Sequence, residues 1–364
     1  MGSPSLETAT QGIATALGQR PGDLRFVAAP NPHPSLLRTL ARLSGEACHY
    51  AEPYLRALTW EGGTLVAFVL YRGEAASAFG VALEEGGAFN RRLTFPTFPR
   101  VLDAHAAVDA DFWIAVRHHC RGRRVMSVRL QSFEAMPLAV PPLGMEAWRR
   151  ERTEYILDLS AAPEDLFQGF ASNHRRNIRK AEEAGLTFQV ADTWEACRQH
   201  AALVGHSMDR RRARGEQVPG PESPEAYHRL VAEGAGRIFR LERNGRVLSS
   251  FLMLSTPRCA YYESGGTAEE GMALGSSHAL MWRAMLHLRE RGVTYFNMGG
   301  TGAQDSEGLR RYKAGFGARQ VNLAHLEFRT AGPLGRCLRQ SAGMCRRAPA
   351  RLAALWRGTE NGGR

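Results

Sequence analysis

The sequence predicts an α+β protein of two domains, in which helices and sheets form packed layers. The chain has 364 residues, more than a single domain of about 100–200 residues requires. Segments in which apolar and polar residues alternate, typical of strands, are interspersed with segments of helical periodicity. Residues 136–144, MPLAVPPLG, contain three prolines, and we interpret them as the linker between the two domains.

The composition is that of a globular protein. Hydrophobic residues make up 44% and charged residues 23% of the chain, which is ordinary for folded domains. No apolar stretch approaches the roughly 20 residues that cross a bilayer, and the first residues, MGSPSLETATQG, lack the features of a signal peptide. The six cysteines form no C-x-x-C pair, which fits a reducing compartment. We therefore expect a soluble, cytoplasmic protein.

The first half of the chain predicts one mixed domain after a polar leader. Residues 1–23 are small and polar, and we expect a flexible leader there. The first domain is expected over residues 24–145. Its expected elements are helices near 35–43 and 109–120, and strands or apolar segments near 64–71, 76–82, 93–98 and 124–130.

The second half predicts a second domain over residues 146–330. Strands are expected at 153–159, 186–190, 236–242, 246–255, 259–263, 293–298 and 319–328. Helices are expected over PEDLFQGF, with Ser160 as a candidate N-cap, and at 173–184, 193–207, 225–233, 278–291 and 307–314. Residues 209–224 and 265–277 are expected to be loops, and Asn244-Gly245 predicts a tight hairpin.

Positive charge is unevenly distributed over the chain. The net charge is +11, carried by 45 arginines and only two lysines, Lys180 and Lys313. Codon bias in a GC-rich genome would explain this ratio, and a lysine that remains could then have a role that arginine cannot fill. Residues 331–364 contain seven arginines and one glutamate, a net +6, and are expected to form a basic amphipathic tail. Such surfaces attract phosphate backbones or anionic lipids.

Several common catalytic motifs are absent from the sequence. Neither lysine lies in the G-x-x-x-x-G-K-[ST] pattern of a P-loop. The sequence also lacks a G-x-S-x-G elbow, an H-E-x-x-H motif and a G-x-G-x-x-G turn after a strand. The twelve histidines show no metal-ligand spacing. We therefore expect neither a P-loop of this form nor a metal site.

Two cationic clusters indicate an anionic partner. The first lies on the helix expected at 173–184 and comprises Arg175, Arg176, Arg179 and Lys180. Its members form like-charge pairs four residues apart, which destabilise a helix by about 0.2–0.5 kcal/mol each. A cationic face kept at that cost is either a binding surface for phosphates or a solvated face. The second cluster, DRRRAR at 209–214, is either a further binding surface or an exposed loop.

Five motifs follow one another in the second half of the chain. In order they are RTEYILDLSAAPEDLFQGFASNHRRNIRKAEEAGLTFQV, YYESGG, the loop and helix at 271–291, YFNMGG and EGLRRYKAGFG. Together they resemble the Fem-type transferases, the peptidoglycan-bridge aminoacyltransferases and related acyltransferases of the GNAT superfamily. The resemblance covers roughly residues 150–330. It implies two GNAT-like domains in tandem, each a mixed central sheet flanked by helices, with residues 24–145 as the divergent copy.

The resemblance also implies a site for the acyl donor at the start of the helix after the fourth strand. In GNAT folds the donor's phosphates bind backbone amides there, and a helix N-terminus is a natural anion site. The candidate donor-binding residues in this loop are Gly271, Gly275, Ser276 and Ser277. The superfamily pattern [RQ]-x-x-G-x-[GA] reads Glu270-x-x-Ala273-x-Gly275 here. Relatives that use aminoacyl-tRNA are similarly degenerate, so the loop favours that donor over acetyl-CoA.

Lys313 and Glu263 are the candidate catalytic residues. Lys313 matches the lysine of the family's [FY]-K-x-x-[FY]-G motif, which is implicated in stabilising charge on the reacting ester. The alternative is that Lys313 is a lysine exposed at the surface. An amine that attacks an activated ester needs only a cation or N–H dipoles near the developing oxyanion. Glu263 could accept a proton from the attacking ammonium, or be a structural carboxylate. Tyr312 and Phe316, in the same motif, are expected in the core or the wall of the donor pocket.

The sequence therefore favours an amide-forming acyltransferase that moves an aminoacyl group from aminoacyl-tRNA to an amine of a small molecule or peptide. One alternative is an acyl-CoA-dependent N-acyltransferase of the same fold. A second is a non-catalytic module that binds RNA or a membrane surface. We expect a monomer that binds tRNA, without membrane insertion and without a cofactor beyond the co-substrate.

Overall fold

The computed structural model describes residues 24–87, 90–102, 106–133, 145–216, 218, 220, 222–302 and 307–330. The predicted leader, the predicted linker at 136–144 and the basic tail at 331–364 lie outside these residues. The described residues divide into two compact units: those within 24–151 together with 323–330 form unit 1, and those within 152–322 form unit 2. The predicted boundary at 145 thus precedes the observed one, and the last described strand runs from unit 2 into unit 1.

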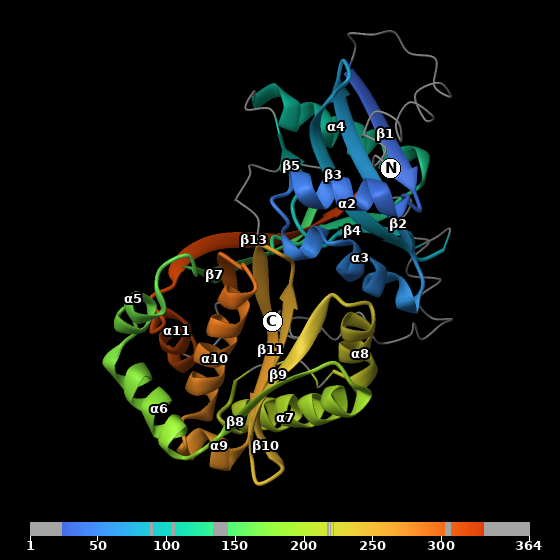
Figure 1. The fold of residues 1–364 in the computed structure, drawn as a ribbon. Helices are drawn as coiled ribbons and strands as arrows, with labels where there is room; N and C mark the ends of the chain where they lie inside the picture. Colours follow the sequence, from blue (N-terminus) through green and yellow to red (C-terminus); the bar gives the residue numbers. More distant parts are fainter. Residues whose placement is uncertain are drawn as a thin grey trace, which may run out of the picture. The chain divides into compact units, whose positions relative to one another are not determined.

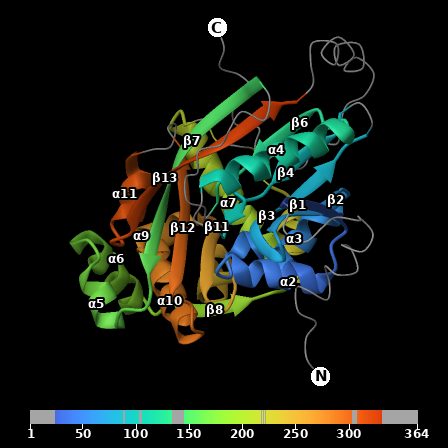
Figure 2. The same ribbon diagram turned by 90° about the horizontal axis from the view of Figure 1, so that it is seen from above.

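Unit 1 is a mixed sheet with helices on both faces (Figure 2). Its elements are β1 (Leu24–Pro30), α2 (Pro34–Leu43), the 3-10 turn η1 (Cys48–Tyr50), α3 (Glu52–Leu58), η2 (Thr59–Glu61), β2 (Thr64–Arg72), β3 (Ala75–Glu85), β4 (Arg92–Phe95), β5 (Arg100–Val101), α4 (Ala106–Gly122), β6 (Ser127–Leu130) and the later part of β13 (Arg319–Arg329). The strand order is β1-β2-β3-β4-β6-β13, with β5 beside β3. Only β4 and β6 are parallel neighbours within it.

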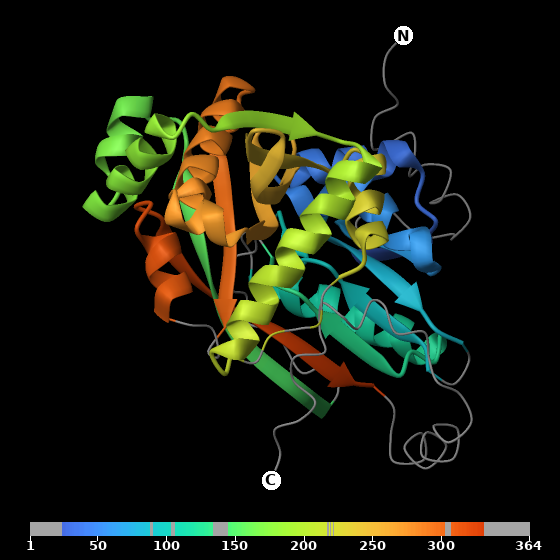
Figure 3. The same ribbon diagram turned by 90° about the horizontal axis from the view of Figure 1, so that it is seen from below.

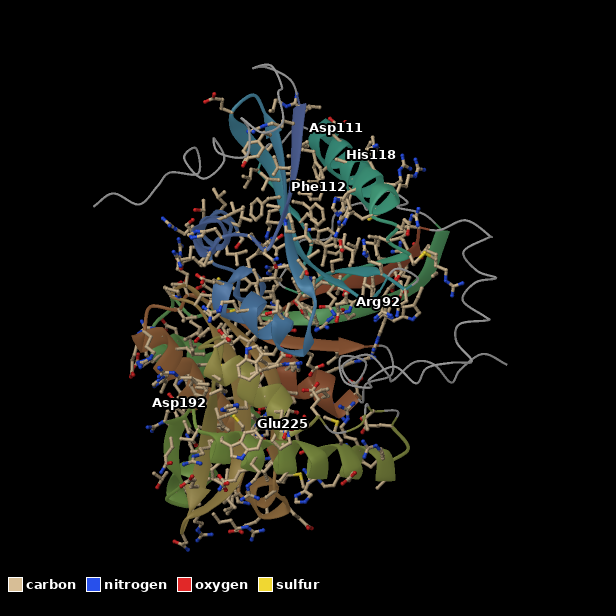
Figure 4. The ribbon with its side chains drawn as sticks, turned by 90° about the vertical axis from the view of Figure 1, so that its right-hand side faces the viewer. Arg92, Asp111, Phe112, His118, Asp192 and Glu225 are labelled. Carbon is tan, nitrogen blue, oxygen red and sulfur yellow. The ribbon has the colours of Figure 1, made fainter. Side chains whose placement is uncertain are left out.

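Alternation along the strands divides the core of unit 1 between the two sheet faces. On one face, Phe68 of β2 belongs to a buried cluster with Phe112 of α4. On the other face, Phe79 of β3 contacts Tyr50 of η1, with ring centroids 5.3 Å apart. Figure 4 shows Phe112 on the side of α4 that faces the strands and His118 on the outer side.

Unit 2 is a second mixed sheet covered on both faces (Figure 1). Its elements are β7 (Met145–Asp158), α5 (Pro163–Gln168), α6 (Ser172–Glu183), β8 (Thr187–Ala191), α7 (Trp194–Ala213), α8 (Pro224–Ala232), β9 (Gly236–Arg243), β10 (Arg246–Ser255), β11 (Cys259–Thr267), α9 (Glu269–Ala273), α10 (Ser276–Glu290), β12 (Tyr295–Gly302), α11 (Glu307–Ala314) and the start of β13. The strand order is β7-β12-β11-β10-β9-β8. Only β11 and β12 are parallel neighbours within it.

The helices of unit 2 form two layers, one on each face of its sheet. Phe251 and Met253 of β10 belong to the buried cluster with Leu280 of α10. Ser250, the residue before Phe251, faces the other way, and its Oγ lies 2.9 Å from His200 Nδ1 of α7. Figure 3 shows α7 crossing the strands on this second face. We call the two sides of this sheet the α10 face and the α7 face.

The two units share one order of elements. In unit 1 it is β1, α2, α3, β2, β3, β4, α4, β6, and in unit 2 it is β8, α7, α8, β9, β10, β11, α10, β12. In each unit the last two strands of this series are parallel, and an antiparallel strand follows them in the sheet: β13 beside β6, and β7 beside β12. The predicted tandem arrangement of two similar domains is confirmed.

The loops predicted at 209–224 and 265–277 are wrong in part. Helix α7 continues to Ala213, and an ion pair between Arg212 and Asp209, three residues apart, supports its last turn. The second segment contains the end of β11 and the short helix α9. Gly266 lies in the strand, because a Cβ there would be 2.2 Å from the carbonyl carbon of Leu203 in α7. That glycine permits close packing and does not mark a loop.

Two local signals had different outcomes. Asn244 and Gly245 have φ of 51° and 76°, which fits the predicted hairpin turn. Ser160, in contrast, is not an N-cap: Ala162 is the N-cap of α5, with Pro163 in its first turn. The Ser160 N–H donates to Asp158 Oδ1 at 2.8 Å instead. None of the described helices is long and apolar enough to cross a membrane.

Candidate functional site

Strands β11 and β12 pair at their beginnings and then separate. Their parallel register ends at Tyr261 opposite Asn297, although β11 continues beside β10 and β12 continues beside β7. Just past that point each strand has a register shift, at Glu263 in β11 and at Met298-Gly299 in β12. A bulge bends its strand and increases the local twist. We interpret the two bulges as the cause of the separation.

The bulge in β12 binds the side chain of Lys313. Gly299 has φ of +70°, and a Cβ there would lie 2.7 Å from the Tyr262 carbonyl oxygen, so glycine is required. Lys313, on α11, is only 4% exposed. Its Nζ donates to the carbonyl oxygens of Met298 at 2.7 Å and Gly300 at 3.1 Å. The ammonium also lies 5.4 Å from the centroid of the Tyr262 ring. Lys313 is therefore a buried ammonium and not a surface lysine.

A buried polar network supports the same bulge from the α7 face. Glu154 and Asn297 are fully buried, whereas Tyr155, Phe296 and Met298 beside them belong to the cluster of the α10 face. Glu154 Oε1 accepts from the Tyr261 hydroxyl at 3.1 Å and pairs with Arg152 Nη2 at 3.0 Å. Glu154 Oε2 accepts from Asn297 Nδ2 at 2.7 Å, and Asn297 Oδ1 accepts from the Gly299 N–H at 2.9 Å. Burial lowers the pKa of Arg152, but Tyr261 and Glu154 outweigh it and raise this pKa.

Glu263 lies at the bulge of β11, near side chains of the α7 face. It is half-buried, and its charge is among those that raise the pKa of Arg152. Burial chiefly raises the pKa of Tyr227, and the charges of Glu222 and Glu263 add to that shift. Lys313, in contrast, lies over Tyr262, which packs in the cluster of the α10 face. The two candidate catalytic residues are thus at the bulges of the two strands, where the pairing of β11 with β12 ends.

A histidine fixes the residue next to Glu263. His200 is fully buried, with Nδ1 2.9 Å from Ser250 Oγ and Nε2 2.9 Å from Ser264 Oγ. Burial lowers the pKa of His200 to about 3, so its ring is neutral and donates from one nitrogen and accepts at the other. The Tyr227 ring packs edge-on against the His200 ring, with ring centroids 4.7 Å apart. This contact holds β11 just past its bulge.

The predicted donor loop is closely packed at the start of α10. Gly275 is the N-cap with φ of +73°, and a Cβ there would lie 2.5 Å from the Asn177 carbonyl oxygen of α6. Ser276 is fully buried, and its hydroxyl is hydrogen-bonded to that of Ser249. The Ser277 carbonyl accepts from the Tyr312 hydroxyl. The His278 N–H already donates to the Gly275 carbonyl at 3.1 Å. The N–H groups of Ser276 and Ser277, which precede the first bond of the helix, are the ones that could bind an anion here.

Gly271 and Glu270 lie in α9, directly before this helix. A Cβ on Gly271 would be 2.5 Å from Ser276 Oγ, so this glycine also serves close packing. Glu270 is paired with Arg246 at 3.3 Å and Arg243 at 3.9 Å, both in the β9–β10 hairpin. The negative charge that the sequence places at this loop is therefore offset by two arginines nearby.

The four cations predicted on α6 have two kinds of environment. Arg175 Nη1 donates to the carbonyl oxygens of Gln168 at 2.6 Å and Phe170 at 2.8 Å, at the end of α5. Its guanidinium thus holds two elements together. The other three cations are exposed: Arg176, Arg179 and Lys180. The Arg179 guanidinium lies 5.7 Å from the centroid of the Phe167 ring. We call these three the α6 cations.

An aromatic cluster joins α6, α10 and α11. Phe316 is 1% exposed and belongs to the core, and Tyr312 donates from its hydroxyl to the start of α10. His174 Nε2 donates to the Tyr312 carbonyl oxygen at 2.8 Å, and its ring lies 4.6 Å from that of His278. Burial lowers the pKa of both histidines, that of His278 to about 4. The cluster is neutral and fixes α11, which carries Lys313.

The second predicted cationic cluster is partly neutralised within the chain. Arg211 and Arg214 pair with Glu216 at 2.7 and 2.8 Å. Arg212 pairs with Asp209 at 2.5 Å. Residues 209–214 therefore present fewer uncompensated charges than their sequence indicates, whereas the α6 cations project from a single helix.

Neither metal nor thiol chemistry is evident where the structure describes the chain. Over that part, no three or more His, Cys, Asp or Glu side chains are grouped to hold a metal ion. The cysteines described there are free and buried: Cys48, Cys120, Cys197 and Cys259. Burial raises the pKa of Cys120 to about 12 and that of Cys197 to about 11. Such thiols are poor nucleophiles.

Sequence reasoning missed the network around Glu154. The network comprises Arg152, Glu154 and Asn297, whose strands the alternation predicts to be buried on both faces. The carboxylate of Glu154 in such a strand is the one signal in the sequence that could have indicated the network. Arg152 pairs directly with Glu154 because the two residues are two positions apart in β7 and therefore lie on the same face of the sheet.

Comparisons with known proteins agree with this architecture. Residues 168–314, from the end of α5 to the end of α11, match the family model of the acetyltransferase (GNAT) domain. The crystal structure of FemX aligns with a TM-score of 0.61 at 11% identity, covering 80% of this chain and 93% of that one. A tandem GNAT protein from the clavulanic acid biosynthesis pathway aligns with a TM-score of 0.51 at 12% identity, covering 85% and 99%. No curated protein sequence matches the chain. Residues 168–314 thus match the GNAT domain, and the predicted Fem-like GNAT fold is confirmed.

Proposed function

We propose that this chain is an amide-forming acyltransferase that transfers an aminoacyl group from aminoacyl-tRNA to an amine of a small molecule or peptide. The observation that carries the proposal is the bulged opening between β11 and β12 in a GNAT domain. A buried ammonium, Lys313, lies at one bulge, and a half-buried carboxylate, Glu263, lies at the other. This pair of charges suits an amine attacking an activated ester.

In the proposed reaction the acceptor amine attacks the ester carbonyl carbon of the donor. The amine loses one proton to Glu263 before attack and passes a second to the departing ribose oxygen. The new C–N bond forms as the ester C–O bond breaks. Lys313 stabilises the negative charge that develops on the carbonyl oxygen, a role that a compact ammonium can fill as a point charge.

The α6 cations support tRNA as the donor. Arg176, Arg179 and Lys180 are exposed on one helix, and the same helix contacts the N-cap of α10 through Asn177. A cationic surface beside an anion-binding helix start suits a polyphosphate backbone. Each phosphate that such a surface neutralises releases counterions, so donor binding should weaken steeply with salt.

An acyl-CoA donor is the second candidate. The match to the acetyltransferase (GNAT) domain favours it, and so do Arg243 and Arg246, which pair with Glu270 in α9, directly before α10. These arginines supply positive charge near the place where GNAT folds bind the donor's phosphates.

The experiment that separates the donors is a transfer assay with purified protein. It compares charged total tRNA with a panel of acyl-CoAs, using a mixture of amines and peptides as acceptors, with and without RNase. We expect RNase-sensitive transfer from charged tRNA, with an apparent KM that rises with salt. RNase-insensitive transfer from an acyl-CoA would replace the first candidate by the second. Binding of RNA or anionic vesicles without transfer from either donor would indicate a non-catalytic module.

A further inference from the structure

The bulge that binds Lys313 is held by groups on both faces of the sheet. From the α10 face, Lys313 Nζ donates to the carbonyl oxygens of Met298 and Gly300. From the α7 face, the side chain of Asn297 accepts from the Gly299 N–H at 2.9 Å. The position of the ammonium therefore depends on the backbone conformation over these four residues, because both of its carbonyl acceptors belong to the bulge.

Asn297 is in turn oriented by Glu154. The Asn297 amide donates to Glu154 Oε2 at 2.7 Å, and this bond fixes which side of the amide faces the Gly299 N–H. Both residues are fully buried. A buried carboxylate is costly unless it is paired and hydrogen-bonded, and Arg152 and Tyr261 meet that need at Glu154 Oε1.

The two glycines of the bulge are required for two separate reasons. Gly299 has φ of +70° and approaches the Tyr262 carbonyl, whereas a Cβ on Gly300 would lie 2.2 Å from Arg152 Nη2. Gly300 thus provides the space in which the guanidinium reaches Glu154. The sequence therefore specifies both the bulge and the ion pair behind it.

We infer that Glu154 is a positioning residue for Lys313, which acts through Asn297 and the Gly299 N–H to fix the carbonyls that hold the ammonium. This inference rests on the proposed function in assigning Lys313 a role in transfer. Glu154 itself contacts neither donor nor acceptor in this scheme. Its carboxylate acts across the sheet, through two hydrogen bonds and one peptide segment.

The lysine content of the chain allows a direct test. The chain has two lysines, Lys180 and Lys313, so selective ¹⁵N-labelling of lysine gives two ammonium signals in the full-length protein. Lys313 is buried and hydrogen-bonded, and Lys180 is exposed, so their ammonium protons should exchange at different rates and identify them. Lys180 then serves as an internal reference.

The main variant is Glu154→Gln, which keeps the size of the side chain and removes its charge. We expect the Lys313 signal to move and the Lys180 signal to stay. We also expect kcat to fall by up to about 10²-fold, as a small misplacement of a reacting group can cause, with KM for both substrates little changed. Because the effect passes through Lys313, the double variant Glu154→Gln/Lys313→Ala should have the kcat of Lys313→Ala alone.

The matched control is Glu327→Gln in β13, which removes a strand carboxylate paired with Arg129 at 2.6 Å in unit 1. It should leave both lysine signals in place. If Glu154→Gln does not fold, Tyr261→Phe removes one hydrogen bond to the same carboxylate and should move the Lys313 signal by a smaller amount.

An unmoved Lys313 signal in a folded Glu154→Gln or Tyr261→Phe variant would overturn the inference, as would additive losses of kcat in the double variant. The spectrum does not depend on turnover. A moved signal in a protein that transfers no acyl group from any donor would therefore support the positioning role while contradicting the proposed function.

Discussion

The parallel strand pairs of the two units differ in one respect. In unit 1, β4 and β6 stay paired from Arg92 opposite Ser127 to Phe95 opposite Leu130, with no register shift. In unit 2, β11 and β12 separate after Tyr261, where both strands are bulged. The surrounding elements follow the same order in both units. The bulges, and not the topology, distinguish the unit that carries the candidate site.

The residues at the two pairs explain this difference. In unit 1, Leu93, Phe95, Val128 and Leu130 are fully buried and belong to one apolar cluster. In unit 2 the equivalent region contains Glu263, Asn297 and two glycines, and it is supported by buried polar contacts. Apolar side chains favour continuous pairing, whereas glycines and buried polar groups permit an opening. Unit 1 thus keeps only the apolar packing of the fold, and unit 2 combines that packing with the polar groups of the candidate site.

The largest expected effect is that of Lys313→Ala. It should lower kcat by about 10²–10³, as the loss of one oxyanion donor does, while donor binding stays near normal. Lys313→Arg should be partly active at best, because its planar guanidinium is larger than an ammonium. The control is Lys180→Ala, the other lysine of the chain, which should leave kcat unchanged and affect only the apparent KM for charged tRNA, because Lys180 is one of the α6 cations. Steady-state kinetics on both variants check this, and full activity of Lys313→Arg with a mild effect of Lys313→Ala would place the chemistry elsewhere.

A matched pair of truncations tests whether the two strand pairs have different roles. Phe95→Ala in β4 and Met298→Ala in β12 each remove a fully buried side chain. Each should lower the free energy of unfolding by about 2–5 kcal/mol. Only Met298→Ala should also lower kcat per folded molecule, because the Met298 carbonyl holds Lys313. Denaturant titration and active-site-normalised kinetics measure both quantities. Equal losses of kcat in the two variants would remove the distinction between the units.

Charge reversal on α6 should have a smaller effect, confined to the donor. Arg176→Glu and Arg179→Glu should each raise the apparent KM for charged tRNA and reduce the dependence of binding on salt, because phosphate contacts are lost. Arg121→Glu, an equally exposed position on α4 of unit 1, is the control and should change neither. The measurement is KM at several salt concentrations. An unchanged KM in both α6 variants would exclude this helix as the tRNA contact.

The smallest expected effect is a loss of stability in acid. Burial lowers the pKa of His278 from 6.5 to about 4, and lowers that of His174, so both are neutral in the folded protein and take up protons more readily when unfolded. Their contribution to stability is complete above pH 6.5 and is lost as the pH falls from 6.5 toward 4. His278→Phe should make the free energy of unfolding less dependent on pH in that range. Denaturant titrations at several pH values check it; an identical slope would mean that these rings do not titrate on unfolding.

The sequence predicted the regular elements better than the contacts between them. Apolar alternation located most strands, and Asn244-Gly245 identified the hairpin, because both signals are local. The extension of α7 was missed, because its arginines find acidic partners that composition does not reveal. Ser160 was misassigned because Asp158 binds its N–H. Local signals thus fail where a tertiary contact competes.

The same limit applies to the candidate site, of which the sequence predicted residues but not their contacts. Motifs singled out Lys313 and Glu263 as candidates, but not the bulges at which they lie, because a bulge depends on the pairing with a neighbouring strand. Arg175 was predicted to bind the donor, and in the structure it holds the end of α5. Glu154 and Asn297 were missed because their partnership joins segments that are 143 residues apart.

Hydrogen–deuterium exchange with a bound donor tests the central claim most directly, namely that the donor binds at the separated strands of unit 2. The donor class that supports transfer is added in a non-reactive form, such as an amide-linked aminoacyl-tRNA or a CoA analogue without the thioester. We expect protection of amides in β11 past Tyr261, in β12 past Asn297 and at the start of α10, with those of β4 and β6 unchanged. Protection of β4 and β6 with none in β11 and β12 would contradict the account.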